Sequence, residues 1–545
     1  MSTPIFALCD EHVTRWAALD PVGATFRGIR GHGGRGTDYG PDGVAARADL
    51  IRDTRRRLAG LTPTGGDDRL AAAHLAERLD AQLALIDNGE WMRDLSAAFG
   101  RVQHLRDSVD LVDHDGDDGW RPVVERLAAM PGMLAGWCRS LSLGQAKGLT
   151  AARRQAIGAA LQAETYAAGT HDALIARYGD GPLRDELVTA ASAAHTGYAA
   201  TADYLRREYA PAAGEADGVG PERYRLFSRM ALGADVDPVE AYEWGWAELR
   251  RLEAEMRAEC GGRPVEEVEA ALDASEFVDG PDAYRAWLQD EHDRALDRLD
   301  GVQFDIDARL RTVEVVLAPA ANSVGVYYTG PTEDGSRPGR TWWSVAGRQR
   351  FTVWEELTTV FHEGVPGHHL QVGQVRLAGD RLSRFTRVSG VSAHSEGWAL
   401  YAERFADELG WYDRPGTRLG MLEASALRAA RVVIDLGLHL DLPLPAGETD
   451  RHGRRWTFEV AAEVLRERGR CAAHRVHSEI VRYCGWPAQA TGYKLGERVW
   501  LAARDEARTA LGGRFDLRRW HARAIALGPL GLGTFTDELR RTVSP

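Results

Sequence analysis

The chain has 545 residues, 44% of them apolar and 27% charged, which is usual for a globular protein with a large core. Its net charge of −13 argues against the basic face that nucleic-acid binding needs, and no apolar run is long enough to span a bilayer. The N-terminus lacks the pattern of a signal peptide, and five scattered cysteines predict reduced packing thiols. We expect a cytoplasmic protein with no nucleic-acid or membrane partner; a homodimer is compatible with the sequence.

Most of the first 300 residues have helical periodicity. Apolar side chains recur at spacings of three and four over 45–61 and 69–89, and Gly89 takes a plausible C-cap position. Another helix is expected over 237–262, where Asp-Pro begins it and a double glycine ends it. We interpret residues 1–300 as an N-terminal helical region that covers a cleft.

The pattern changes near residue 302. Segments 311–320 and 323–330 are β-branched or aromatic and bounded by Pro, Gly and Asn, which predicts strands of a small sheet, and 331–344 is typical of a loop. Helical periodicity returns over 352–364 and 395–410 and continues to the C-terminus. The predicted fold class is mainly α, with the sheet and the motif helices together forming a catalytic region over 301–545.

The segment VFHEGVPGHHLQV (360–372) carries the main chemical signal. In a zincin helix, two histidines four residues apart bind one metal and the glutamate between them is the general base. Here Pro366 takes that fourth position, and the next histidines are His368 and His369. In a straight helix His368 would lie about 120° off the face of His362, and His369 would lie about 10.5 Å along the axis.

Pro366 also suggests how a site can still form. Proline lacks the N–H that would bond to the carbonyl of His362, so the helix should kink or end there, and neighbouring glycines permit a tight turn. The break would bring one paired histidine back towards His362. We favour His368 as the ligand, with His369 as alternate ligand or substrate contact. The competing interpretation is a helix end that carries surface histidines.

Two glutamates further along the chain complete the predicted site. Glu396 lies 34 residues after His362 on the helix predicted over 395–410 and is the best candidate for a third ligand. Glu403 shares its face and would orient a ligand histidine by a hydrogen bond. Each could instead be a solvated surface glutamate, but the flanking Trp398 and Tyr401 predict a largely buried helix.

The residue types around this cluster predict a mechanism. Zinc would activate a water molecule, Glu363 would take its proton, and a tyrosine hydroxyl would stabilise the oxyanion. Tyr327, Tyr328 and Tyr493 are candidates for such a contact, although tyrosine is more often a packing residue.

A polar stripe runs along the apolar segment 427–440. Arg428, Arg431, Asp435 and His439 recur there at spacings of three and four. Either arginine could bind a substrate carboxylate, and His439 could face the reaction centre. An internal salt bridge between Arg431 and Asp435 is the equal alternative.

Five stretches together resemble the bacterial domain-of-unknown-function family 885. They are YYTGPTEDGSRPGRTWW, VFHEGVPGHHLQ, EGWALYAERFADELG, LRAARVVIDLGLHL and YCGWPAQATGYKLGERVWLAARDEA, and a weaker likeness covers the N-terminal helices. Such proteins look like relatives of helical gluzincin metallopeptidases, which enclose a cleft between two mostly helical halves.

The resemblance implies a metallopeptidase-like fold and a set of roles. It puts His362, Glu396 and either His368 or His369 on the metal, with Glu363 as base, and it makes Tyr493 a candidate oxyanion donor. One departure is Ala488, where the family more often has glycine, so the turn before Tyr493 is expected to differ.

We therefore expect a zinc metallopeptidase of oligopeptidase, dipeptidase or carboxypeptidase type, with one Zn²⁺ per chain and short peptides as substrates. Two alternatives remain: a non-catalytic ligand-binding protein with a degenerate metal site, and a metal-dependent amidohydrolase that acts on a small non-peptide amide.

Overall fold

The computed structural model describes residues 3–112, 114, 116–318, 325–331, 337–345 and 347–543. It is mainly α-helical with a small amount of sheet, as predicted. The helices that precede the larger sheet are α1 (Pro4–Leu19), α2 (Pro21–Phe26), α3 (Pro41–Ala59), α4 (Gly66–Asp87), α5 (Arg101–Asp110), α6 (Gly116–Ala146), α7 (Arg153–Ala167), α8 (Asp172–Tyr178), α9 (Arg184–Tyr204), α10 (Ala210–Ala212), α11 (Pro221–Leu232), α12 (Pro238–Glu259), α13 (Val265–Ser275) and α14 (Pro281–Leu299).

The helices that follow the sheet carry the sequence motifs. They are α15 (Leu357–Glu363), α16 (His368–Leu377), α17 (Arg384–Val388), α18 (Ser392–Glu408), α19 (Thr417–Leu440), α20 (Ala446–His452), α21 (Phe458–Glu467), α22 (Ala473–Gly485), α23 (Gly492–Leu511), α24 (Leu517–Ala526) and α25 (Leu532–Val543).

The predicted capping signals account for several helix ends. The side chain of Asp237 accepts hydrogen bonds from the backbone N–H groups of Val239 and Glu240 at the start of α12. Gly89 is left-handed (φ 73°) just beyond the end of α4, and Gly261 is left-handed (φ 61°) just beyond α12. The helices predicted over 69–89 and 237–262 are confirmed by α4 and α12.

The main sheet has the order β2-β4-β3. β2 (Val313–Ala318) pairs with β4 (Gly339–Ser344) in parallel, and β3 (Tyr327–Thr329) pairs with β4 antiparallel, so both predicted strands are confirmed. The predicted loop over 331–344 is wrong for residues 339–344: the alternate residues of GRTWWS are buried, so the segment forms the central strand. Residues 332–336 of that loop lie outside the described residues.

A second, smaller pairing joins two short strands that the sequence did not reveal. β1 (Phe277–Asp279) and β5 (Arg350–Thr352) pair antiparallel over three residues each. Strands of this length carry almost no periodic signal, and β1 lies in a stretch predicted to be helical.

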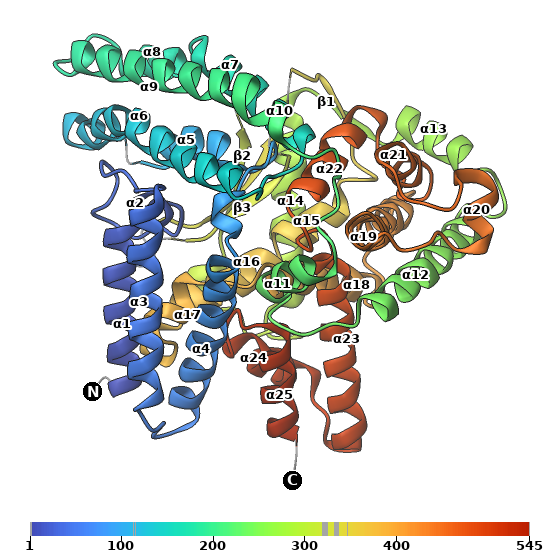
Figure 1. Cartoon of the computed structure of the whole chain (residues 1–545). Helices are drawn as coiled ribbons and strands as arrows, with labels where there is room; N and C mark the ends of the chain where they lie inside the picture. Colours follow the sequence, from blue (N-terminus) through green and yellow to red (C-terminus); the bar gives the residue numbers. More distant parts are fainter. Residues whose placement is uncertain are drawn as a thin grey trace.

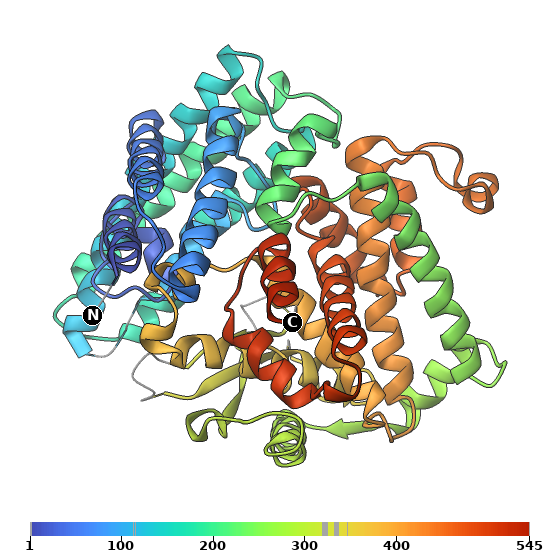
Figure 2. The ribbon, with the colours of Figure 1, turned by 90° about the horizontal axis from the view of Figure 1, so that it is seen from below.

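Buried apolar side chains form three clusters that reflect the arrangement of the helices. One lies between α1, α3 and α4, and a second lies among α5, α6, α7 and α9. The largest joins Leu70 of α4 to elements between Tyr224 and Leu539. Figures 1 and 2 show α1 to α9 on one side of the molecule, and α12 and α13 beside α19 to α21 on the other. The largest cluster runs across residue 300, and the division predicted there stays a prediction.

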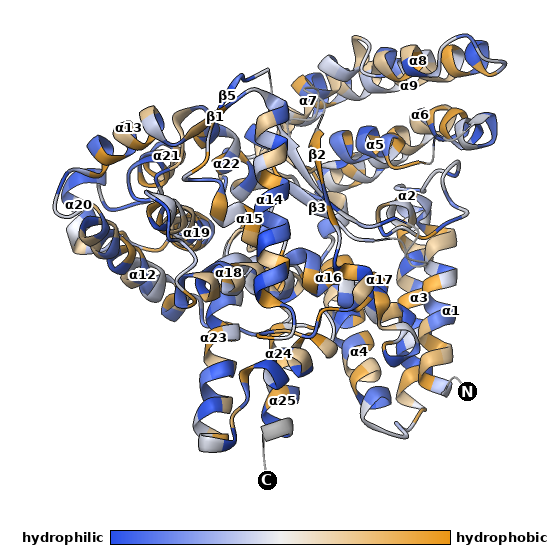
Figure 3. Cartoon of the chain, turned by 180° about the vertical axis from the view of Figure 1, so that it is seen from behind, coloured by the Kyte–Doolittle hydropathy of each residue, from blue (hydrophilic) through white to orange (hydrophobic). Residues whose placement is uncertain are grey.

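None of the described helices is long and apolar enough to cross a membrane. Most of the ribbons carry both hydrophilic and hydrophobic residues along their length (Figure 3).

Two glycines let α18 and α23 approach closely enough to shape the site. A Cβ atom on Gly496 would lie 2.1 Å from the carbonyl oxygen of Ala393, and one on Gly397 would lie 2.4 Å from the carbonyl carbon of Gly496. Since neither position can hold a methyl group without movement, the crossing depends on glycine. It sets the start of α23, and with it Tyr493, beside the start of α18, which carries Glu396.

Replacing Gly496 with alanine should therefore destabilise the protein. The added methyl group meets backbone atoms, so we expect a loss of about 1–3 kcal/mol in the free energy of unfolding. The matched control is Gly132→Ala in α6, where a Cβ atom meets nothing within 4 Å, and which should stabilise by about 0.5–1 kcal/mol. Urea denaturation of both variants measures the difference; equal midpoints would contradict the close-packed crossing.

Candidate metal centre

The histidine segment is divided between two helices. α15 ends at Glu363 and α16 begins at His368, so the predicted break at Pro366 is confirmed. The backbone N–H of Gly367 donates to the carbonyl oxygen of Phe361 at 3.0 Å, which turns the chain back on itself. A Cβ atom on Gly367 would lie 2.0 Å from the carbonyl oxygen of His362, so only glycine fits this turn.

A buried tryptophan on α18 holds the turn from outside. The indole N–H of Trp398 donates to the carbonyl oxygens of Pro366 (2.8 Å) and Gly367 (3.1 Å). The Gly367 carbonyl oxygen also accepts from the backbone N–H of Gln371 at 3.2 Å, so the turn is bonded both to α16 and to α18. The side chain of Trp398 thus fixes the turn relative to α18.

The turn brings the two histidines to one glutamate. His362 Nε2 lies 3.4 Å and His368 Nε2 lies 3.6 Å from Glu396 Oε2, and the imidazole rings are nearly perpendicular at 86°. One donor atom from each of these three side chains lies within 4.8 Å of the others. In the described part of the chain, no other group of three His, Cys, Asp or Glu side chains comes together in this way.

His369 points away from this cluster. Its Nε2 lies 2.8 Å from the carbonyl oxygen of Leu310, and its Nδ1 lies 3.1 Å from the hydroxyl oxygen of Tyr328 on β3. The side chain is fully buried between α16 and the sheet. The structure therefore joins His368, the favoured histidine, to His362 and gives His369 a packing position.

Glu403 holds the other nitrogen of His362. Its Oε1 lies 2.7 Å from His362 Nδ1, and its Oε2 accepts a hydrogen bond of 2.6 Å from the Thr358 hydroxyl. Burial alone would raise the pKa of Glu403, but the guanidinium of Arg428, 3.5 Å away, and His362 hold it below its usual range. An ionised Glu403 keeps the proton on Nδ1 and leaves Nε2 free to face the cluster.

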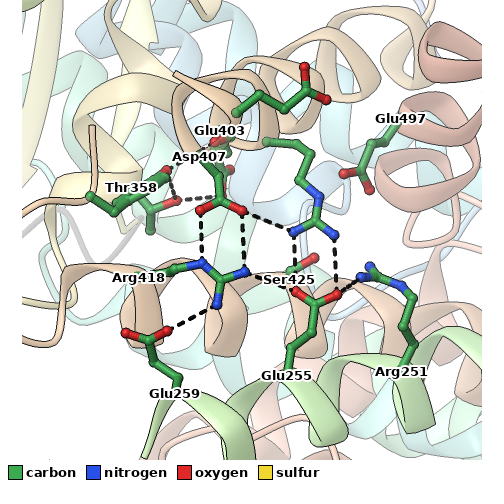
Figure 4. A network of polar contacts seen from close by, with 12 residues as sticks. Arg251, Glu255, Glu259, Thr358, Glu403, Asp407, Arg418, Ser425 and Glu497 are labelled. Atoms are coloured by element: carbon green, nitrogen blue, oxygen red, sulfur yellow. Dashed lines mark hydrogen bonds and ion pairs between the residues drawn. The ribbon is translucent and has the colours of Figure 1, made fainter. Parts of the chain in front are cut away.

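Ion pairs fix α18 at the level of Glu403. Asp407, one turn further along α18, pairs with Arg418 of α19 at 2.9 Å, and Glu255 of α12 pairs with the same arginine at 3.3 Å (Figure 4). Three helices are therefore tied together behind the cluster. Partly buried, shared pairs of this kind resist the movement of any one helix.

The electrostatics of the cluster suit a cation. Burial alone would raise the pKa of Glu396, but hydrogen bonds to His362 and His368 hold it well below the usual range. Burial alone would lower the pKa of His362, but Glu396 and Glu403 raise it to about 9. Two imidazole nitrogens and one carboxylate oxygen, with another carboxylate behind one imidazole, are a donor set that fits catalytic zinc.

Two further predicted residues lie at the same place. Glu363 is 6% exposed and lines the cavity with His362 and His368. Burial raises the pKa of Glu363, although His362 and His368 oppose the shift. Tyr493 begins the first turn of α23, and its ring lies 4.8 Å from the guanidinium carbon of Arg431. Burial and the charge of Glu396 raise the pKa of Tyr493, which keeps its hydroxyl protonated as a donor.

The turn before Tyr493 tolerates alanine in place of glycine. Ala488 adopts a left-handed conformation (φ 65°), and its backbone N–H donates to Asp435 Oδ1 at 3.1 Å. Left-handed backbone favours glycine, and a buried carboxyl group holds the alanine in it here.

One large cavity of about 2570 Å³ is lined by His362, Glu363, His368, Glu396 and Tyr493. Arg428, Tyr327 and Tyr328 line it as well, whereas His439 does not: its Nε2 lies 3.0 Å from the carbonyl oxygen of Tyr483 in the packed interior. The suggestion that His439 faces the reaction centre is therefore not supported, because that side of α19 packs on α22.

Arg431 finds its partner on α22. It donates to Glu479 Oε2 at 2.9 Å and to the Tyr483 hydroxyl at 3.1 Å, so the salt bridge to Asp435 is absent from the described contacts. Glu479, Arg482 and Tyr483 of α22 were not predicted as site residues. Their spacing of three and four on one helix was the available signal.

The comparisons with known proteins identify the family and the fold. The model of a family of bacterial proteins of unknown function, DUF885, matches residues 21–539, so the chain belongs to this family. The search of curated proteins found no match. The gluzincin-like activity that the resemblance implied stays a prediction.

Two solved structures share the fold over nearly the whole chain. A putative lipoprotein from Colwellia psychrerythraea is 20% identical with a TM-score of 0.83, covering 99% of this chain and 98% of that one. A putative lipoprotein of unknown function from Shewanella oneidensis is 16% identical with a TM-score of 0.74, covering 98% of this chain and 99% of that one. At these identities the likeness shows the fold alone.

The geometry predicts different consequences for the two adjacent histidines. Protein purified without chelator should carry about one zinc ion per chain, and His368→Ala should lose it because one of three donors is gone. His369→Asn should keep its zinc, since the ring nitrogens of His369 are bonded to Leu310 and Tyr328 and not directed at the cluster. Metal analysis by mass spectrometry, with circular dichroism to show folding, provides the test. Zinc lost from His369→Asn and kept by His368→Ala would contradict the assignment.

Proposed function

We propose that the chain is a zinc-dependent peptidase that hydrolyses short peptides. The observation that carries this proposal is the convergence of His362, His368 and Glu396 donor atoms in a large cavity, beside the buried carboxyl group of Glu363. Metal-assisted hydrolysis requires side chains that bind the metal and, beside them, a carboxyl group that can act as general base.

Zinc held by these donors would supply Lewis acidity towards water and the scissile carbonyl group. The chain supplies the proton transfers: a Glu363 carboxylate oxygen accepts the proton of the attacking water and returns it to the amine nitrogen that leaves. The Tyr493 hydroxyl donates a hydrogen bond to the developing oxyanion. Arg431, stacked on the Tyr493 ring, keeps that ring in one orientation.

The position of the donors restricts the substrate. His362 is 5% exposed, and the cavity is lined from both sides, by α5 and α7 of the N-terminal region and by α15 to α19, α22 and α23. An extended peptide segment can reach such a site, whereas a folded domain cannot. A small non-peptide amide would also fit, but it would leave most of the cavity unfilled.

Removing the proposed base should abolish hydrolysis without removing the metal. For Glu363→Gln we expect kcat/KM for short peptides to fall about 10²- to 10⁴-fold. The matched control is Glu355→Gln, because Glu355 is an exposed glutamate that lines the same cavity and should change activity little. Mass spectrometry of peptide mixtures measures cleavage, and metal analysis checks zinc content.

Full activity in Glu363→Gln would contradict the mechanism. Failure of purified, zinc-loaded wild-type protein to cleave any peptide, with turnover of acylated amino acids instead, would favour an amidohydrolase. No turnover of either class would favour the ligand-binding protein.

Arg428 should recognise the free carboxylate of a peptide substrate. Its guanidinium lines the cavity and makes one ion pair, to Glu403 at 3.5 Å. A charge-assisted bond from its other donors to a C-terminal carboxylate would favour a free peptide over its amide by about tenfold in KM. Arg428→Gln should remove this preference, while Arg475→Gln, an exposed cavity arginine, should keep it. An unchanged preference in Arg428→Gln would rule out this contact.

A further inference from the structure

Helix α7 exposes the side chains that a surface helix normally buries. Four alanines between residues 156 and 163 are fully buried where α7 packs on α9, whereas Ile157 and Leu161 are 48% and 59% exposed. An amphipathic helix places its large apolar residues against the core and its polar residues outside. Ile157 and Leu161 lie one turn apart on the exposed face, and the packing of α7 does not explain why large apolar residues occur there.

Other exposed apolar side chains gather beside them. Among the described residues, six of the nine large apolar side chains that are exposed line the cavity that holds the histidine cluster. We call this set the apolar wall; it consists of Phe26, Phe99, Leu111, Ile157, Leu161 and Trp486. Scattered exposed apolar residues are normal in soluble proteins, but a concentration in one concave surface is typical of a binding site.

Phe99 is held in its exposed position at a conformational cost. Its backbone is left-handed (φ 56°), which is unfavourable for a non-glycine residue, and its ring is half exposed, 5.7 Å from the ring of Trp486. Strain of this kind persists where the surroundings impose it and commonly marks a functional site.

A buried glutamine ties the apolar wall to the catalytic side of the cavity. Gln155 Oε1 accepts a hydrogen bond from the backbone N–H of Ala97 at 2.8 Å, and its Nε2 donates to the carbonyl oxygen of Val481 on α22 at 3.0 Å. Two residues before Val481, Glu479 binds Arg431, which stacks on Tyr493. The apolar wall and the proposed oxyanion donor are therefore fixed relative to each other through α22.

We propose that the apolar wall binds large apolar side chains of a peptide substrate, at positions away from the bond that is cleaved. This inference rests on the proposed peptidase function and deepens it by naming the substrate class. The cavity, about 2570 Å³, exceeds the roughly 300–1,000 Å³ of a typical small-ligand pocket, so several residues of an extended peptide can enter. The charged residues around His362 and Arg428 take the peptide backbone and carboxylate, while the apolar wall takes the side chains.

Peptide binding to the full-length Glu363→Gln chain, measured by calorimetry, tests this inference without turnover. The probes are the hexapeptides Leu-Leu-Ala-Ala-Leu-Leu and Ser-Ser-Ala-Ala-Ser-Ser. Burying leucine side chains should make the first bind at least about tenfold more tightly. The double variant Ile157→Ser/Leu161→Ser should lose most of this preference, and both positions are exposed, so the fold should tolerate the change.

The matched control is Val188→Ser/Val239→Ser, which removes two valines of similar exposure, 44% and 51%, that lie outside the cavity. It should keep the leucine preference. Equal affinities for the two hexapeptides, or no binding of either, would overturn the inference. Tight binding of an N-lauroyl serine peptide in place of the leucine peptide would also overturn it, because the wall would then bind an acyl chain. So would a change from dimer to monomer in the double variant without loss of peptide selectivity, because the wall would then be a dimer interface.

These outcomes separate the inference from the peptidase proposal. If the wild-type chain hydrolyses both hexapeptides with equal kcat/KM, and the two bind with equal affinity, the peptidase proposal is supported. The proposal that the apolar wall recognises the substrate is then contradicted. A leucine preference that depends on Ile157 and Leu161, in a wild-type chain that cleaves no peptide, would support peptide binding there and remove the peptidase.

Discussion

The hydrogen bonds between the Trp398 indole and the turn that precedes α16 are the constraint on which the site depends. Helix α18 carries both Trp398 and Glu396, so the helix that supplies the carboxylate also fixes the break that separates the two histidines. His362 and His368 can approach one oxygen atom only because the chain leaves the helical path between them. Pro366 interrupts the spacing of the usual zincin motif, and the same interruption allows His368 to lie beside His362.

Buried charge explains why the surrounding helices are tied so firmly. Glu363 and Glu403 are buried and Glu396 is partly buried, and the three carboxyl groups lie around two imidazoles and a guanidinium. Burying charged groups is unfavourable unless each has a partner in good geometry. The pairs behind α18 hold that geometry from one side, and the Gly397–Gly496 crossing holds it from the other. A divalent cation bound at the donor atoms would pair with the Glu396 carboxylate in the same way.

The sequence allowed prediction of those features that depend on local chemistry. Proline and glycine predicted the break. The spacing of Glu396 and Glu403 on one helix predicted that Glu396 would join the cluster and that Glu403 would orient a ligand histidine, and the histidine that Glu403 contacts is His362. Features that depend on distant partners were not predictable. His369 turns towards Tyr328 and Leu310, and Arg431 turns towards Glu479, because of elements whose positions no local pattern encodes.

The apolar wall is another feature that the local sequence pattern did not predict. Ile157 and Leu161 lie four residues apart, a spacing that usually marks the packed face of a helix, but the alanines of α7 occupy that face instead. Strand β4 was not predicted either, because its glycine and the neighbouring prolines are typical of a loop. The segment forms a strand because it pairs with β2 on one edge and with β3 on the other.

The most direct test of the account is anomalous diffraction at the zinc absorption edge from crystals of the zinc-loaded chain. The account predicts one strong anomalous peak per chain, within bonding distance of His362 Nε2, His368 Nε2 and a Glu396 oxygen, with His369 still at Leu310 and Tyr328. A peak bound by His369, or no peak at this cluster in zinc-saturated crystals, would contradict the claim that the interrupted motif forms a metal centre.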